Sequence, residues 1–229
     1  MWVSLTVTGV IVLALGAAYT VFRTPLVEVK HVVVLGAVRL ADETVLERTD
    51  LLGKNMLTLD SGPSYDAIAR LPLVQEVSIV RAWPNTVRII LREREPWGVW
   101  EQAGVSHPID REGVVLGAVE APADGPRIIS ASLATLRPGD RVDPEAIRAV
   151  IEIAELLPAA LGSQVAEVAF VPGKGVQVTT TDEQVGVLGD STGIAYKLAV
   201  WAAAIIEAEE ERVSYTVIDL RFGNRPVLQ

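Results

Sequence analysis

The start of the chain carries the feature that most constrains what the molecule can be. Residues Trp2 to Phe22 contain no charged side chain, and Arg23 ends this run. A helix rises about 1.5 Å per residue, so about 20 apolar residues span a hydrocarbon core of about 30 Å. We therefore predict one transmembrane helix over residues 1–23, followed by a water-soluble body.

The residues expected within the bilayer include Trp2, Gly9, Ala14, Ala18 and Phe22. Ala14 and Ala18 share one helix face, where small side chains let another helix approach closely. A cleaved signal peptide is an alternative, but such a peptide normally has a basic start and a shorter apolar core. A buried core helix is a second alternative, although so long a run without charge is unusual for one.

The charges around this helix bear on its orientation. No lysine or arginine precedes the apolar run, whereas Arg23, Lys30 and Arg39 follow it. Basic residues favour the cytoplasmic side of a membrane, so this count alone places the body in the cytoplasm.

Composition narrows the chemistry that the body can perform. The chain has 229 residues, a net charge of −9 and no cysteine. About 200 residues follow the expected helix, enough for one large or two small domains with hydrophobic cores. An acidic chain is not expected to bind nucleic acid through bulk electrostatics. The lack of cysteine excludes disulfides, thiolate catalysis and cysteine-based zinc sites.

The first part of the body reads as strand, helix, helix, strand, strand. The pattern predicts strands at 26–35, 74–81 and 86–94, with helices capped by Asp42 and Ser64. In the last strand Val87, Ile89 and Leu91 share one face, and the other face carries Arg88, Ile90 and Arg92. A three-stranded sheet with both helices on one face would bury most of the apolar side chains.

Glu95–Pro96 marks a boundary, after which the pattern predicts a mixed, mostly antiparallel β domain with two helices. Asp143 is expected to cap the first helix, and the second is expected over 192–211. The predicted strands are 97–101, 105–109, 113–116, 165–171, 176–181, 184–188 and 215–222. The fold class is therefore α+β, with an anchor at 1–23 and domains at 24–95 and 96–229.

No motif specifies an active site. Gly189-Asp190-Ser191-Thr192-Gly193 fits G-x-S-x-G between a strand and a helix, the context of a serine nucleophile. Hydrolases with this motif place their histidine base last, but His31 and His107 both precede Ser191. We interpret the motif as a turn and helix cap, with a membrane-anchored serine hydrolase as a less favoured alternative.

The two histidines have no metal-ligand spacing, and no phosphate-binding loop is present. We expect no catalytic, cofactor or metal residues.

An ordered set of motifs resembles the FtsQ/DivIB family of bacterial cell-division proteins. The motifs of the first part are Val27–Val29, Val34–Gly36, Leu52–Met56, Arg70–Val74, Val77–Val80, Arg81–Thr86, Ile89 and Arg92–Pro96. They are similar to the POTRA domain of that family. The motifs Ile109–Val115, Lys197–Leu198 and Ile218–Phe222 are similar to its second, β domain.

The resemblance implies a non-catalytic protein of the inner membrane at the division septum. Its N-terminus would lie in the cytoplasm and its body outside, against the charge count. The implied partners are small coiled-coil proteins of the FtsB/DivIC and FtsL type, with no small-molecule substrate and no cofactor. A POTRA-bearing secretion or membrane-assembly component is the alternative, but it would need tandem POTRA units or a barrel, which do not fit after Trp97.

The resemblance and the sequence together indicate how a partner would bind. The strand-like segment Phe222–Leu228 lies near the chain end, where a strand often forms a sheet edge to which a partner strand can add. Pro226 cannot donate to a ladder, so it should face away from pairing or limit its length. Phe222 and Asn224 fall at family positions that contact the partner, and Val227 joins them as an expected contact.

Overall fold

The computed structural model describes residues 27–223 and 225–229, which form two compact units divided between Arg94 and Glu95. The expected transmembrane residues Trp2, Gly9, Ala14, Ala18 and Phe22 lie outside the described residues. Within the described ranges, no helix combines the length and the apolar character that crossing a bilayer requires.

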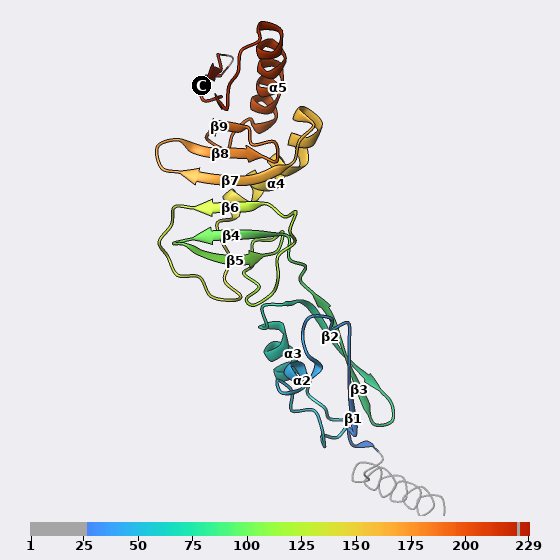
Figure 1. The fold of residues 1–229 in the computed structure, drawn as a ribbon. Helices are drawn as coiled ribbons and strands as arrows, with labels where there is room; N and C mark the ends of the chain where they lie inside the picture. Colours follow the sequence, from blue (N-terminus) through green and yellow to red (C-terminus); the bar gives the residue numbers. More distant parts are fainter. Residues whose placement is uncertain (1–26, 224) are drawn as a thin grey trace, which may run out of the picture. The chain divides into compact units, whose positions relative to one another are not determined.

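The first unit has the strand–helix–helix–strand–strand order expected from its sequence (Figure 1). Its sheet has the order β1-β3-β2, with β1 parallel and β2 antiparallel to β3. The elements are β1 (His31–Leu35), α2 (Asp42–Leu46), α3 (Gly62–Ala69), β2 (Val74–Ala82) and β3 (Thr86–Glu93).

Alternation along β3 creates the core of this unit. Val87, Ile89 and Leu91 are buried together with Val45 of α2 and Ile68 of α3. The helices therefore cover one face of the sheet, and the other face is left to solvent.

Three local predictions for this unit were wrong. Asp42 is the first residue of α2, and Ser64 lies inside α3 because Pro63 in the first turn begins that helix earlier. Neither residue is a cap. The first strand starts at His31 because the residues before it bond to a loop, with the Val29 N–H donating to the Lys54 carbonyl at 2.9 Å.

A buried carboxylate links a loop of the first unit to its central strand. Glu93 at the end of β3 accepts the backbone N–H groups of Val38, Arg39 and Leu40 at 2.7 to 3.0 Å. Burial acts to raise the pKa of Glu93, but the N–H groups of Leu40, Val38 and Arg39 and the charge of Arg39 outweigh it, so this pKa is lowered. The carboxylate thus ties the loop after β1 to the central strand.

We expect Glu93→Gln to lower the free energy of unfolding by about 1–3 kcal/mol, because the amide offers the N–H cluster only one uncharged acceptor. Since the folded pKa is lowered, the contribution of Glu93 is present above its unfolded pKa of about 4.3 and is lost as pH falls through the folded value. Chemical denaturation between pH 3 and 7 measures this. The matched control is Glu95→Gln at an exposed site, and equal stability of the two variants would contradict the role of Glu93.

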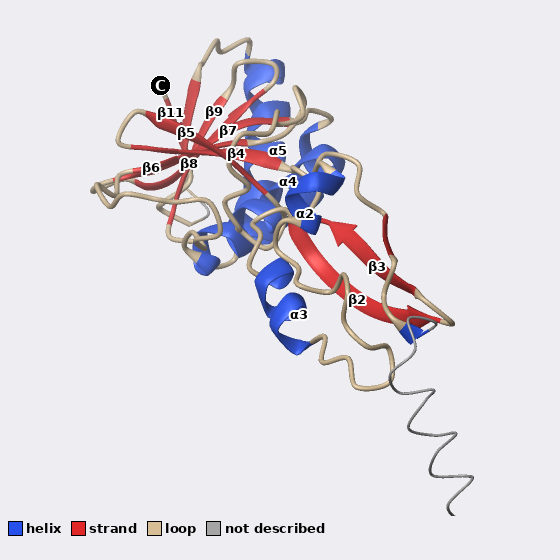
Figure 2. Ribbon diagram, turned by 90° about the horizontal axis from the view of Figure 1, so that it is seen from below, coloured by secondary structure: helices blue, strands red, loops and turns tan. Residues whose placement is uncertain are grey.

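The second unit is an eight-stranded sheet of order β11-β10-β9-β8-β7-β6-β4-β5. Among the described residues, four of its pairings are antiparallel and three are parallel, so the sheet is mixed. Helices α4 and α5 lie together on one side of the sheet (Figure 2). The elements are β4 (Gly98–Gln102), β5 (Val105–Ile109), β6 (Arg127–Ser130), α4 (Pro144–Leu161), β7 (Val165–Val171), β8 (Gly175–Thr180), β9 (Val185–Gly189), α5 (Ile194–Glu211), β10 (Val217–Asp219) and β11 (Val227–Leu228).

The helices of this unit begin and pack for identifiable reasons. Asp143 caps α4 as expected, because its Oδ1 accepts the Glu145 N–H at 2.8 Å and Pro144 is the first helical residue. Trp201 of α5 is fully buried against the backbone of β9 at Gly186, where a Cβ would come within 2.2 Å of the indole ring. The glycine therefore allows α5 to lie directly on the sheet.

Three strand predictions for this unit need correction. Residues 113–116 form only isolated bridges, between Ile109 and Val115 and between Val114 and Arg141. The short strand β6 follows a proline- and glycine-rich loop and was not predicted. The strand expected over 215–222 is shorter in the structure and consists of β10 alone, because the chain turns after Asp219.

Candidate interaction edge

The C-terminal segment forms one margin of the large sheet. Within the described part of the chain β11 pairs with β10 alone, in the register Ile218 with Leu228 and Asp219 with Val227. β10 in turn is held by β9 on its other side. The last strand therefore has one side that its own unit does not pair.

Hydrogen bonds at the end of this strand show which backbone groups face outward. The Val217 N–H donates to the Gln229 carbonyl at 3.1 Å, and the Gln229 N–H donates to the Val217 carbonyl at 2.9 Å. Successive residues of an antiparallel strand point their N–H and C=O groups to opposite sides. Those of Val227 therefore also face β10, and those of Leu228 face away from it. By the same alternation Pro226 faces outward, where it offers a carbonyl but no N–H.

The side chains of β11 alternate as well. Leu228 packs against the hydrophobic core, whereas Val227 is 45% exposed. Phe222, in the turn between β10 and β11, is 61% exposed. Both predicted contact residues are thus accessible beside the open margin, while Asn224 lies outside the described residues.

The opposite margin of the sheet is less open. The outer carbonyl of Pro108 on β5 accepts the Leu116 N–H at 2.9 Å, and the Asp110 N–H donates to the Val114 carbonyl at 3.2 Å. Residues 114–116 thus use part of the β5 edge. In the described part of this unit, β11 is the more accessible edge.

An ion pair sets the shape of the turn that leads to β11. The guanidinium of Arg221 donates to both carboxylate oxygens of Asp219, with Nε–Oδ1 at 2.9 Å and Nη2–Oδ2 at 2.6 Å. Arg221 also lies over the ring of Phe222, with Cζ 5.5 Å from the ring centre. The Arg221 hydrogen bond lowers the pKa of the buried Asp219, although burial opposes it. The pair therefore positions Phe222 at the surface.

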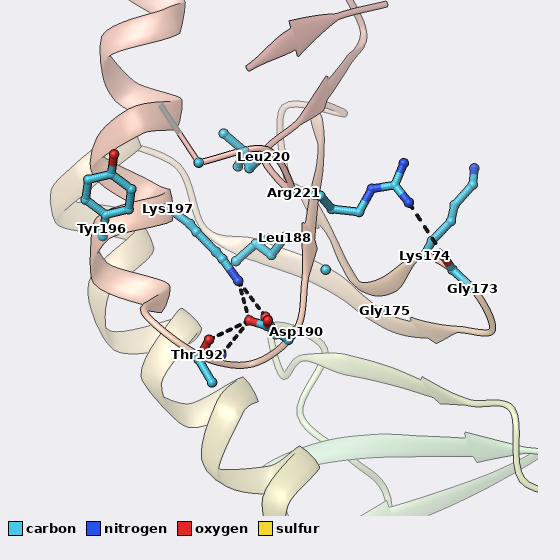
Figure 3. Close-up of a pocket in the computed structure, with 12 residues that line it drawn as sticks. Gly173, Lys174, Gly175, Leu188, Asp190, Thr192, Tyr196, Lys197, Leu220 and Arg221 are labelled. Carbon is cyan, nitrogen blue, oxygen red and sulfur yellow. Dashed lines mark hydrogen bonds and ion pairs between the residues drawn. The ribbon is translucent and has the colours of Figure 1, made fainter. Parts of the chain in front are cut away.

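A shallow depression of about 550 Å³ lies next to this turn and reaches the start of α5 (Figure 3). Lys197 points to Asp190, with Nζ–Oδ1 at 2.7 Å, and Arg221 extends toward the Gly173 carbonyl. The hydrogen bonds of Lys197 and Thr192 hold the pKa of Asp190 well below its usual range. Lys197 and Arg221 are therefore engaged by carboxylates of the same unit, and Lys174 is the third cation that lines the depression.

The G-x-S-x-G segment belongs to this depression and behaves as a turn. Asp190 Oδ1 accepts the Thr192 N–H at 3.1 Å and its hydroxyl at 2.7 Å. The only histidine of residues 95–229, His107, lies on β5 at the far end of the strand order. Ser191 thus has no histidine base within this unit. The described residues also contain no group of side chains suited to hold a metal ion.

Sequence reasoning selected Phe222 and Val227 but missed Asp219 and Arg221 as residues that shape the edge. Their spacing alone was no signal, because β10 ends at Asp219 and the turn that follows brings the Arg221 guanidinium back to the carboxylate.

Comparison with known proteins agrees with this architecture. A model of the POTRA domain, FtsQ-type, matches residues 27–94, and a model of the C-terminal part of cell division protein FtsQ/DivIB matches residues 98–221. The chain belongs to the FtsQ/DivIB family. The second match ends one residue before Phe222, so the expected contact residues lie beyond it.

Relatives named cell division protein FtsQ cover most of the chain. The protein of Chloroflexus aurantiacus is 29% identical over 218 residues, which are 94% of this chain and 79% of the relative. That of Chloroflexus aggregans is 29% identical over 213 residues, or 92% and 76% of the two chains. The protein of Mycobacteroides abscessus is 27% identical over 186 residues, or 81% and 58%. The family resemblance seen in the sequence is thereby confirmed.

We expect Asp219→Asn to loosen the turn before β11, because the buried amide leaves Arg221 with a single neutral acceptor. The lowered pKa of Asp219 means that its stabilising effect is present above the unfolded pKa of about 3.9 and is lost as pH falls through the folded value. Backbone hydrogen exchange at residues 217–222 should rise about fivefold or more at pH 7. Asp182→Asn, in the exposed turn between β8 and β9, is the control, and slow exchange in both variants would refute the role of the ion pair.

Proposed function

We propose that this chain is a non-catalytic scaffold of the bacterial divisome that holds small coiled-coil division proteins of the FtsB/DivIC and FtsL type. Membership of the FtsQ/DivIB family supports a role in division. The proposal that a partner binds by strand addition rests on the open margin of β11, which an extended partner segment can join as a further strand.

The margin offers few backbone groups, so side chains must contribute to the binding. Leu228 presents an outward N–H and carbonyl, and Pro226 adds a carbonyl alone. Phe222 and Val227 lie beside these groups, and an exposed aromatic residue is a common anchor at interfaces. We assign Phe222, Val227 and Asn224 to partner contact, with the Asp219–Arg221 pair as the positioning element.

A fold-level reason favours this role over the alternatives. The second unit is one continuous eight-stranded mixed sheet, unlike the three-stranded POTRA sheet of the first unit, so the described residues do not form tandem POTRA units. Ser191 has no histidine base within the second unit, so we place the hydrolase alternative last. We assign residues 24–95 to the POTRA-like domain and residues 96–229 to the partner-binding β domain.

Three variants separate the side-chain and backbone parts of strand addition. Phe222→Ala should weaken binding of an FtsB/DivIC-type protein from the same bacterium about tenfold, the usual loss for a central aromatic contact. Leu228→Ala keeps the outward N–H, whereas Leu228→Pro removes it, so the proline variant should bind about tenfold more weakly than the alanine variant. Titration calorimetry with the purified partner measures all three.

The comparison between the two Leu228 variants is decisive because both lose the same core contact. Circular dichroism and thermal unfolding must show that both remain folded. Equal affinities of Leu228→Pro and Leu228→Ala would remove strand addition at β11, and an unchanged affinity of Phe222→Ala would remove Phe222 from the interface.

We also propose that residues 1–23 anchor the chain in the inner membrane at the septum, with the N-terminus in the cytoplasm and the body outside. The family supports this orientation, whereas Arg23, Lys30 and Arg39 oppose it. A reporter enzyme fused after Gln229 that folds only outside the cytoplasm should be active. Activity of a cytoplasm-only reporter at the same position would reverse the assignment.

A further inference from the structure

The solvent side of the small sheet carries an apolar cluster that the proposed function does not use. Strand register places Val33 of β1, Arg88 of β3 and Val80 of β2 side by side in one row. The neighbouring row is Leu35, Ile90 and Ser78. We call the cluster Val33, Leu35, Val80, Ile90 and Arg88 the outer sheet face.

The four aliphatic residues of this face are substantially exposed, at 40% for Val33, 45% for Leu35, 44% for Val80 and 43% for Ile90. A single exposed valine on a strand needs no explanation, because such residues favour strands. Here the register places Leu35 beside both Val33 and Ile90, and Val80 lies across Arg88 from Val33, so the four residues surround one arginine on three strands. A contiguous exposed apolar patch rimmed by polar groups is typical of a protein-binding surface.

A cation lies at the centre of the outer sheet face. Arg88 forms no ion pair with any described residue, whereas Arg92, two rows further along β3, pairs with Glu76 of β2. Arg88 is flanked by Val33 and Val80, so a ligand that covers the valines also covers its guanidinium. A charge that is desolvated on binding requires an opposite charge on the ligand.

The backbone of the sheet limits the shape of this ligand. β3 is the central strand, and its backbone groups pair with β1 on one side and β2 on the other. A partner strand cannot add to it, so the face binds through side chains alone. Helices α2 and α3 cover the opposite face (Figure 1), and packing a helix on a sheet face is one of the few stable ways to bury such a face.

We propose that the outer sheet face binds an amphipathic helix of another protein, with an Asp or Glu of the helix set within its apolar stripe and paired with Arg88. A second copy of this chain fits less well, since a twofold contact would bring two Arg88 side chains together. An anionic membrane fits less well because Glu76 lies on the same face. The outer sheet face belongs to the first unit, whereas β11 belongs to the second.

Site-specific photocrosslinking in the native full-length chain tests the proposal. A photoreactive residue replaces Ile90 in dividing cells, and a matched control replaces the exposed Leu133 in the other unit. Mass spectrometry then identifies the crosslinked segment. We expect a helical segment with a carboxylate three or four residues from apolar neighbours, at a yield several-fold above that at Leu133.

The identified segment, made as a peptide, then tests the charge pair. Arg88→Glu in the full chain should weaken its binding about tenfold or more, Arg88→Gln should weaken it less, and a peptide with the acid changed to Lys should recover affinity for Arg88→Glu. Unchanged thermal unfolding of both variants shows that the fold is kept.

Several results would overturn the inference. These are a lipid adduct, an adduct with a second copy, an adduct with a non-acidic or extended segment, a yield no higher than at Leu133, or binding that is insensitive to Arg88. Phe222→Ala should leave the Ile90 adduct unchanged, so failure of the β11 proposal does not remove this one. Loss of the adduct in that variant would show that the outer sheet face does not bind independently.

Discussion

No described strand pairs with the outer side of β11, so the outward N–H and carbonyl of Leu228 are left for a partner, and the proposed binding depends on these two groups. Only two residues of β11 are in ladder pairing, so its position relies on β10 and the core contact of Leu228. β10 is itself short, but it lies between β9 and β11 and precedes a turn closed by an ion pair. The outer side of β11 is therefore unpaired among the described strands, although the strand itself is held in place.

Both units use a buried carboxylate to hold a loop beside a strand. Glu93 accepts three backbone N–H groups of residues 38–40, and Asp219 accepts the guanidinium of Arg221. Each carboxylate lies at the end of a strand, where the ladder no longer satisfies the backbone. In both cases the hydrogen bonds outweigh the cost of burial, as the lowered pKa values of Glu93 and Asp219 indicate.

Much of the architecture could be predicted from hydrophobic period and turn chemistry. The alternation of Val87, Ile89 and Leu91 and the Asp143–Pro144 helix start are local signals, and both predictions were confirmed. The errors arose where distant residues decide the outcome. β6 is short and is defined by its neighbours β4 and β7, while the segment at 113–116 has strand-like composition but bridges only at single residues. The roles of Asp219 and Arg221 could not be separated from ordinary surface charge without the turn that joins them.

Pro226 has a consequence for the behaviour of this chain at high local concentration. An accessible sheet margin is a template on which identical molecules can stack into aggregates. Two such margins brought together would each lack a donor at the proline, so the shared ladder would end after very few bonds. A molecule gathered in many copies at one place in a cell can thus keep its binding strand accessible to a different polypeptide while it resists polymerising with itself.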